Sequence, residues 1–347
     1  MSIGRGLWTG MALGAVVASP VAADAPKVVA SIKPVHSLVA GVMQGVGEPA
    51  LVIQGVGSPH TYSLRPSEAR AIEQADIVFW VGEGMETFLV KPLEALPTDA
   101  RVVELAEADG VTLLPTREGG MWEAHVHDEE HEQGDGHHHD EDEHAAQHDE
   151  DEAGHHEDEE QAHHGDQAHA DGAADMHIWL DPHNAEAMIA AIAAALSEVD
   201  PEHAALYQQN AAALRQDLER LDAALRAKLA PVRERPFVVF HDAYQYFEQR
   251  YGLNPVGAIS IGPDRRPGAQ RLGEIRDRLQ VTEAACVFAE PQFEPAVVET
   301  VIEGTGARKG VLDPLGATLE AGPGLYAQLL ESLAGSLTEC LGAGQSG

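Results

Sequence analysis

Short apolar runs alternate with helix-like segments along most of this 347-residue chain. β-rich runs such as KVVASI and DIVFWVG are separated by stretches of helical character, one of which begins at Pro66, a residue that suits the first turn of a helix. The alternation begins again beyond Pro231, where the expected strands are FVVFH, NPVGAI, ACVFAE and KGVLDP. This rhythm predicts an α/β fold of two similar lobes with parallel strands.

A regular apolar stripe between the two lobes predicts a long connecting helix. Leucines recur at spacings of four, three, four and four, which places them on one helical face: Leu214, Leu218, Leu221, Leu225 and Leu229. A rigid helix from residue 202 to 229 would span roughly 42 Å at 1.5 Å per residue. We therefore expect an N-terminal lobe at 24–200, the linking helix at 201–230 and a C-terminal lobe at 231–347. Such an architecture places a ligand site in the cleft between the lobes.

One stretch, from residue 123 to 171, interrupts this pattern. It contains 20 acidic residues, no lysine or arginine, and 13 of the 19 histidines, so the rest of the chain carries −15 of the formal charge of −35. Because it lacks bulky apolar side chains, it cannot offset its ordering entropy, and we expect a disordered insertion in the first lobe. Its imidazoles predict weak metal binding, with a solvated acidic spacer as the alternative. The acidity disfavours nucleic acid as a partner and favours cations.

The N-terminus and the cysteines both indicate export. Residues 1–23 have the pattern of a cleavable signal peptide, with a lone Arg5, an apolar run and small residues ending at Ala23, which predicts a periplasmic protein. No later run reaches the ~18 apolar residues needed to cross a bilayer, so we expect no membrane insertion. Two cysteines, Cys286 and Cys340, are an even number in an oxidising compartment, which favours a disulfide over two buried thiols.

Metal-capable side chains follow several of the expected strands: His60, His241, Glu290 and Asp313, with His177 where the chain leaves the insertion. Imidazoles with one carboxylate suit zinc, which is commonly held by four ligands. The intervals of 117, 64 and 72 residues between His60, His177, His241 and Asp313 match no local metal motif. Three histidines and a water also describe a catalytic zinc, but the chain has no HExxH-like helix, so a zinc-dependent hydrolase is the weaker alternative.

Several segments of the chain together carry a family resemblance: IKPVHSLVAGVM, GSPHTYSLRPSEARAIEQADIVFWVGEGMETFL, MHIWLDPHNA, VVFHDAYQYF, GAQRLGEIRDRL, FAEPQF and LDPLG. The chain resembles the substrate-binding subunits of bacterial high-affinity zinc ABC importers, the ZnuA type of the cluster A-I metal-binding proteins. The resemblance spans nearly all of the mature chain, including the histidine-rich insertion. It implies a monomer that captures Zn²⁺ and delivers it to a membrane permease driven by a cytoplasmic ATPase. The insertion would serve as an auxiliary, low-affinity zinc collector or sensor.

The resemblance also implies a ligand set. The zinc ligands of the family fall on His60, His177 and His241, whereas Asp313 matches a carboxylate that ligates metal in manganese-type relatives. The fourth ligand is therefore Asp313 or water. Manganese-type relatives have a glutamate where this chain has His241, which favours zinc and leaves a manganese-binding member as the alternative.

Three further features are expected to have structural or orienting roles. The cysteines Cys286 and Cys340 resemble a disulfide found in zinc members of the family. Glu290 and Asp242 are expected to orient imidazoles rather than to bind the ion. His36, which has apolar neighbours and matches no ligand position, is expected to be structural.

Overall fold

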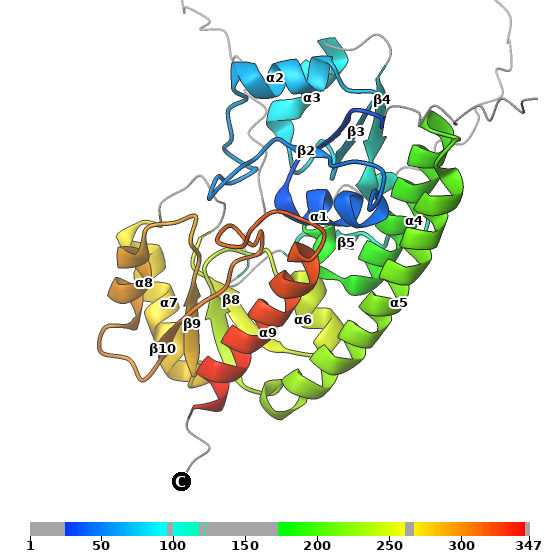
Figure 1. The fold of residues 1–347 in the computed structure, drawn as a ribbon. Helices are drawn as coiled ribbons and strands as arrows, with labels where there is room; N and C mark the ends of the chain where they lie inside the picture. The colour runs from blue at the N-terminus through cyan, green and yellow to red at the C-terminus, as the bar shows by residue number, and fades with distance from the viewer. Residues whose placement is uncertain (1–24, 96–99, 118–121, 123–172, 261–266, 344–347) are drawn as a thin grey trace, which may run out of the picture.

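Two four-stranded parallel sheets form the two lobes of the molecule (Figure 1). The computed structural model describes residues 25–95, 100–117, 122, 173–260 and 267–343. The strand order is β2-β1-β3-β4 in the first sheet and β10-β9-β7-β8 in the second. The predicted α/β architecture of two lobes is therefore confirmed. The predicted signal peptide at 1–23 and the histidine-rich stretch at 123–171 lie outside the described residues.

The strands of both sheets are short, and their central members are almost entirely buried. They are β1 (Val28–Ala30), β2 (Ala50–Leu51), β3 (Ile77–Trp80), β4 (Arg101–Glu104), β7 (Pro236–Val239), β8 (Asn254–Ala258), β9 (Cys286–Ala289) and β10 (Arg308–Val311). The sequences IVFW in β3 and CVFA in β9 show no polar alternation, as expected for parallel strands covered on both faces. Because all pairings within these two sheets are parallel, the carboxyl ends of the strands in each sheet meet at one edge.

Helices cover the sheets and join them. They are α1 (Lys33–Val42), α2 (Pro66–Glu73), α3 (Thr87–Ala95), α4 (Pro182–Val199), α5 (Ala204–Leu229), α6 (Gln245–Tyr251), α7 (Ala269–Thr282), α8 (Pro295–Ile302) and α9 (Leu325–Gly342). Single 3₁₀ turns lie at Leu105–Glu107, Ile178–Leu180 and Ala230–Val232. Helix α3 was not predicted from the sequence, because its internal Pro92 is a residue that normally disfavours a helix interior.

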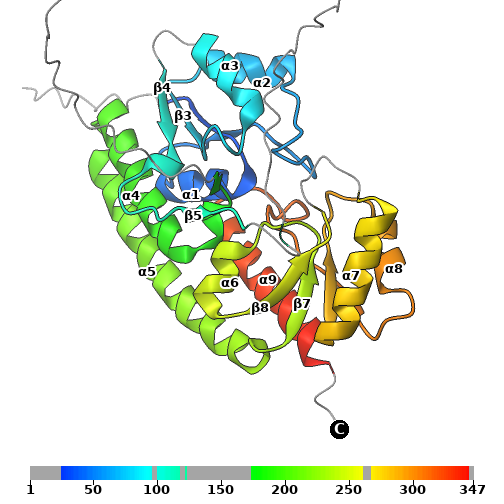
Figure 2. The ribbon, with the colours of Figure 1, turned by 180° about the vertical axis from the view of Figure 1, so that it is seen from behind.

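Helix α5 runs along both lobes, as Figures 1 and 2 show from opposite sides. Its 26 residues correspond to about 39 Å at 1.5 Å per residue. Leu218, Leu225 and Leu229 of the predicted stripe are buried, and α5 packs on α4, α1 and α9. One hydrophobic core extends from Val28 in the first sheet to Leu341 in α9, so the joining helix shares its core with both lobes. The predicted domain boundaries at residues 200 and 230 stay predictions.

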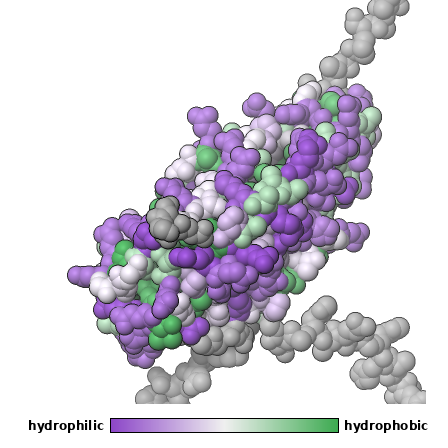
Figure 3. All heavy atoms as spheres, turned by 90° about the horizontal axis from the view of Figure 1, so that it is seen from below, coloured by the Kyte–Doolittle hydropathy of each residue, from purple (hydrophilic) through white to green (hydrophobic). Residues whose placement is uncertain are grey.

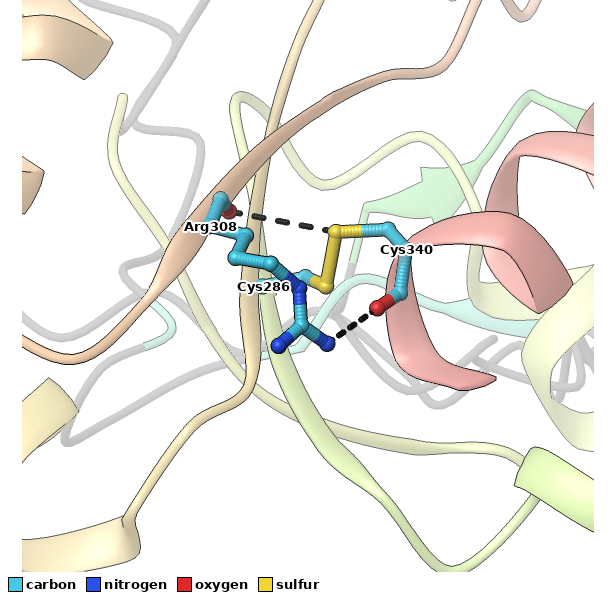
Figure 4. Close-up of a disulfide and its surroundings, with 3 residues drawn as sticks. All are labelled: Cys286, Arg308 and Cys340. Atoms are coloured by element: carbon cyan, nitrogen blue, oxygen red, sulfur yellow. Dashed lines mark hydrogen bonds between the residues drawn. A yellow bond between two sulfur atoms is a disulfide. The ribbon is translucent and has the colours of Figure 1, made fainter. Parts of the chain in front are cut away.

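The predicted disulfide is confirmed and ties the C-terminal helix to the second sheet (Figure 4). Cys286 begins β9 and Cys340 lies near the end of α9, with their Cα atoms 6.2 Å apart. The guanidinium of Arg308 in β10 donates a hydrogen bond to the carbonyl oxygen of Cys340 (Figure 4). A cation is favoured there because the last carbonyl groups of a helix lack intrahelical partners.

The surface is predominantly polar. Seen from below in Figure 3, hydrophilic residues cover most of the face and apolar residues form only small groups. The large apolar side chains exposed on the described surface are scattered along the sequence: Val56, Val102, Leu113, Val281 and Val311. Among the described helices, none has the length and apolar character required to cross a membrane.

Candidate metal centre

Three histidines from distant segments converge between the lobes. His60 follows β2 in the first lobe, His177 precedes the 3₁₀ turn Ile178–Leu180, and His241 follows β7 in the second lobe. One ring nitrogen from each lies within 4.8 Å of the other two, a spacing that allows all three to bind one metal ion. The ring centroids are 5.3 Å apart for His60 and His177, 5.4 Å for His177 and His241, and 6.1 Å for His60 and His241.

Asp175 fixes the orientation of His177. Its Oδ1 accepts hydrogen bonds from Nδ1 of His177 at 2.8 Å and from the backbone N–H of the same residue at 3.0 Å. Because a carboxylate oxygen accepts, Nδ1 carries the hydrogen and Nε2 presents its lone pair. This Nε2 lies 3.3 Å from Nε2 of His60, so the two donor atoms face one another.

The segment that holds Asp175 is itself fixed by a short antiparallel ladder. Strands β5 (Leu114–Pro115) and β6 (Ala174–Asp175) pair, so the two chain ends that flank the histidine-rich stretch meet beside the site. The hydroxyl of Tyr246, from α6 of the second lobe, donates to the carbonyl oxygen of Asp175 at 2.6 Å and accepts from the N–H of Leu114 at 2.9 Å. His177 is thereby positioned by both lobes.

Glu290 orients His241 in the same way. Its Oε1 accepts from Nδ1 of His241 at 2.7 Å, and both side chains are buried. The Nε2 atom of His241 is buried with no hydrogen-bond partner among the described residues, a costly arrangement for a nitrogen that binds nothing. Burial alone lowers the pKa of His241, but the charge of Glu290 and its hydrogen bond outweigh burial and raise this pKa above the ordinary value of 6.5. Glu290 is thus confirmed as an orienting partner.

The histidines line a small pocket. Its volume is about 90 Å³, and Asp175, Asp242 and Gln245 contribute to its wall beside the three imidazoles. One water occupies roughly 30 Å³ in the liquid, so the pocket suits an ion with one or two waters rather than an organic substrate. Two of the three imidazoles are nine-tenths or more buried, which limits competition from bulk water.

The other sequence candidates lie outside the set of converging donor atoms. Asp313 follows β10, and its Oδ1 accepts from Nε2 of Gln292 at 3.0 Å and from the N–H of Leu315 at 3.2 Å. Asp242 does not orient an imidazole as expected, because its carboxylate pairs with Arg117. His36 is buried, and its Nε2 lies 3.0 Å from the carbonyl oxygen of Pro49, in agreement with the expected structural role.

Two residues at the site were missed in the sequence. The sequence contained a local signal for the role of Asp175, because an acid two residues before a candidate ligand is close enough to accept a hydrogen bond from its imidazole. Arg117 had none, since it precedes the histidine-rich stretch and meets Asp242 125 residues further along the chain.

Comparison with known proteins agrees with this geometry. The family model "Zinc-uptake complex component A periplasmic", ZnuA, matches residues 28–340. The chain belongs to the ZnuA family. The high-affinity zinc uptake system protein ZnuA of Brucella abortus (strain 2308) is 50% identical over 323 residues, which cover 93% of this chain and 94% of the relative. The protein of the same description from Paracoccus denitrificans (strain Pd 1222) is 40% identical over 333 residues, 96% of each chain.

The fold is shared with solved members of the ZnuA family. A crystal structure of ZnuA superposes with a TM-score of 0.69 at 25% identity and covers 92% of this chain and 100% of its own. The resemblance predicted from the sequence motifs is therefore confirmed. The family is described as a periplasmic component of a zinc-uptake complex, which is a transport role and not an enzymatic one.

Proposed function

We propose that this protein captures Zn²⁺ in the periplasm with high affinity and delivers it to the membrane permease of an ABC importer. The observation that carries the proposal is the convergence of His60, His177 and His241 within 4.8 Å, on a chain of the ZnuA family. The ion is cargo, so the site must hold it tightly and still release it when the protein docks on the permease. A cytoplasmic ATPase supplies the energy of transport.

Three imidazoles select the ion. Zinc accepts nitrogen donors in a tetrahedral arrangement, and the three histidines leave one position for a fourth ligand. We propose water there, because no oxygen of Asp313 is among the donor atoms that converge within 4.8 Å. Manganese prefers oxygen donors, so a site of three nitrogens favours zinc over manganese.

A hydrolytic role for the bound ion finds no support in the carboxylates around it. A zinc hydrolase needs a general base free to take a proton from the metal-bound water. Asp175 and Glu290 are each bonded to an imidazole, and Asp242 is bonded to Arg117. We therefore expect no turnover of ester or peptide substrates, and an activity lost in His241→Ala would contradict the proposal.

The site is tested by competition titration of Zn²⁺ and Mn²⁺ against a chelator. We expect one tight zinc site in the intact protein, with zinc preferred to manganese. His60→Ala should weaken that site by about 100-fold or more, since one of three protein ligands is lost. His183→Ala is the matched control, because His183 is exposed at the start of α4 and outside the converging set. Tighter binding of manganese than zinc would overturn the metal assignment.

The histidine-rich stretch at 123–171 is proposed to gather zinc at several weak sites near the pocket or to report zinc abundance. Deletion of this stretch should leave the tight site and remove weak binding in a calorimetric titration. Loss of the tight site in the deletion variant would refute this division of roles.

We propose that the protein is exported by a signal peptide at residues 1–23 and acts as a monomer. The N-terminal sequence of protein recovered from the periplasm should begin within a residue or two of Asp24. Light scattering of that material should give the mass of one chain. An uncleaved N-terminus or a stable dimer would refute the corresponding part of the proposal.

A further inference from the structure

Arg117 makes a forked ion pair with Asp242 beside the metal pocket. Its Nε donates to Oδ2 of Asp242 at 2.9 Å, and its Nη2 donates to Oδ1 of the same carboxylate. Nη2 also lies 2.8 Å from Oε2 of Glu248, and the guanidinium carbon lies 3.6 Å from the centre of the Trp122 ring. The side chains of Arg117 and Asp242 are 18% and 15% exposed, so this pair is largely shielded from water.

Asp242 is well placed to reach a bound ion. It directly follows His241, and it lines the same pocket as the three imidazoles. The backbone N–H of Ala243 donates to the carbonyl oxygen of His241 at 2.9 Å, so a tight turn keeps Asp242 close to its neighbour. Yet its oxygens are not among the donor atoms that converge within 4.8 Å. Both oxygens are instead directed to Arg117.

Each of the other carboxylates near the site accepts hydrogen bonds at one oxygen. Asp175 and Glu290 each accept a hydrogen bond from a histidine Nδ1, and Oδ1 of Asp313 accepts from Gln292 and Leu315. Asp242 differs from Asp175 and Glu290 because, among the described residues, it forms no hydrogen bond to an imidazole and both of its oxygens pair with a cation. A guanidinium fork matches a carboxylate at both oxygens, which fixes its direction as well as its charge.

We infer that Arg117 is a specificity-determining residue that holds the carboxylate of Asp242 away from the bound ion. The inference rests on the proposed zinc capture. With Asp242 restrained, the ion meets imidazole nitrogens and a water, a set that suits zinc. A released carboxylate would add a hard oxygen donor, which manganese prefers.

Loss of the arginine would drive this release. A largely buried carboxylate deprived of its cation is strongly disfavoured unless another cation replaces the lost one. The metal ion in the adjacent pocket is such a cation. The freed Asp242 would therefore turn toward the ion and raise its coordination number.

The test is the selectivity of the Arg117→Met variant in competition titrations with Zn²⁺ and Mn²⁺. We expect the affinity for manganese relative to zinc to rise by roughly 10-fold or more. Arg117→Met combined with Asp242→Asn should return the ratio to that of the unmodified protein, because the amide is a poorer metal ligand than the carboxylate. Arg101→Met is the matched control, since Arg101 forms an ion pair with Glu198 on the exposed surface.

Cobalt(II) absorption gives an independent readout of coordination. A four-coordinate cobalt site absorbs strongly in the visible range, and the absorption weakens when a fifth ligand binds. We expect weaker absorption in Arg117→Met and recovery in the double variant. An arginine that only stabilised the fold would change thermal stability but not this spectrum.

Two further variants keep the inference testable where Arg117→Met does not fold. Arg117→Lys keeps the charge but loses the fork, and it should shift selectivity in the same direction to a smaller extent. Asp242→Asn with Arg117 intact removes no ligand, so it should weaken zinc binding far less than His241→Ala does. An unchanged selectivity in the folded arginine variants, or a loss in Asp242→Asn equal to that in His241→Ala, would overturn the inference. Failure of the unmodified protein to bind zinc would instead refute the proposed function.

Discussion

The bond between Glu290 and His241 gives a quantitative prediction for the variant Glu290→Gln. The substitution keeps an oxygen that can accept the hydrogen bond from Nδ1 of His241. It removes the negative charge that makes the imidazole a stronger ligand for the metal ion. The bond is 2.7 Å long and Glu290 is completely shielded from solvent, so water cannot replace the lost charge. Partners of this kind typically change metal affinity by 10- to 100-fold, which corresponds to about 1.4 to 2.7 kcal/mol.

The size of the effect should depend on pH in a defined direction. The charge of Glu290 raises the pKa of His241, so its removal lowers that pKa. Zinc binds the neutral ring. At a pH high enough for the ring to be neutral in both proteins, the variant shows its full loss of affinity. As the pH falls, the ring of the unmodified protein protonates first, so the ratio of the two affinities should shrink toward about pH 5.5.

Zinc titration against a competing chelator, repeated between about pH 5.5 and 8.5, measures this ratio. Glu299→Gln is the control, because Glu299 lies on the surface in helix α8 and pairs there with Lys309. Equal affinity of Glu290→Gln and the unmodified protein near pH 8.5, or a loss that is constant with pH, would refute the role of Glu290.

The metal-free protein should show the opposite trend in stability. A histidine whose pKa is raised by folding contributes stability that is fully present below its unfolded pKa of about 6.5 and is lost as the pH rises through the folded value. Removal of Glu290 should therefore lower the melting temperature more near pH 5.5 than near pH 8.5. Thermal scans of both proteins after chelation check this sign, and a larger loss at alkaline pH would contradict it.

Three other substitutions test separate parts of the structure. Asp313→Asn should change zinc affinity by less than about tenfold, whereas a drop above about 100-fold in the chelator titration would make Asp313 the fourth ligand. Cys286→Ser with Cys340→Ser should lower the free energy of unfolding in urea by about 2 to 4 kcal/mol, and an unchanged value would contradict a stabilising cross-link. Lys33→Met should cost about 1 to 3 kcal/mol, because its buried ammonium donates to three carbonyl groups at residues 316–319. Its control, Lys228→Met, removes only an exposed contact.

The sequence alone determined the main elements of the fold. The alternation of apolar runs with helical segments gave most strands and helices, and the leucine spacing gave α5, because both patterns depend on residues close together in the chain. Helix α3 was not predicted, because Pro92 locally disfavours a helix. Tertiary packing around the buried Leu89 nevertheless stabilises it.

The candidate ligands could also be named from the sequence, through their place after expected strands and through the family motifs. The carboxylates could not be assigned in the same way. Glu290, Asp242 and Asp313 all follow or adjoin strand ends, yet one orients an imidazole, one pairs with Arg117 and one is held by Gln292. Their partners lie 21 to 125 residues away, and no local pattern encodes such pairings.

Only the tertiary structure decided which atoms meet at the pocket. Residue types and periodicity fix what a side chain is able to bind, and they place it on a strand end or a helix face. The packing of two lobes against one long helix fixes the distances, and hydrogen bonds and ion pairs act only over those few ångströms. Which carboxylate orients a histidine, which one pairs with an arginine and which one bonds a glutamine is therefore a property of the folded chain.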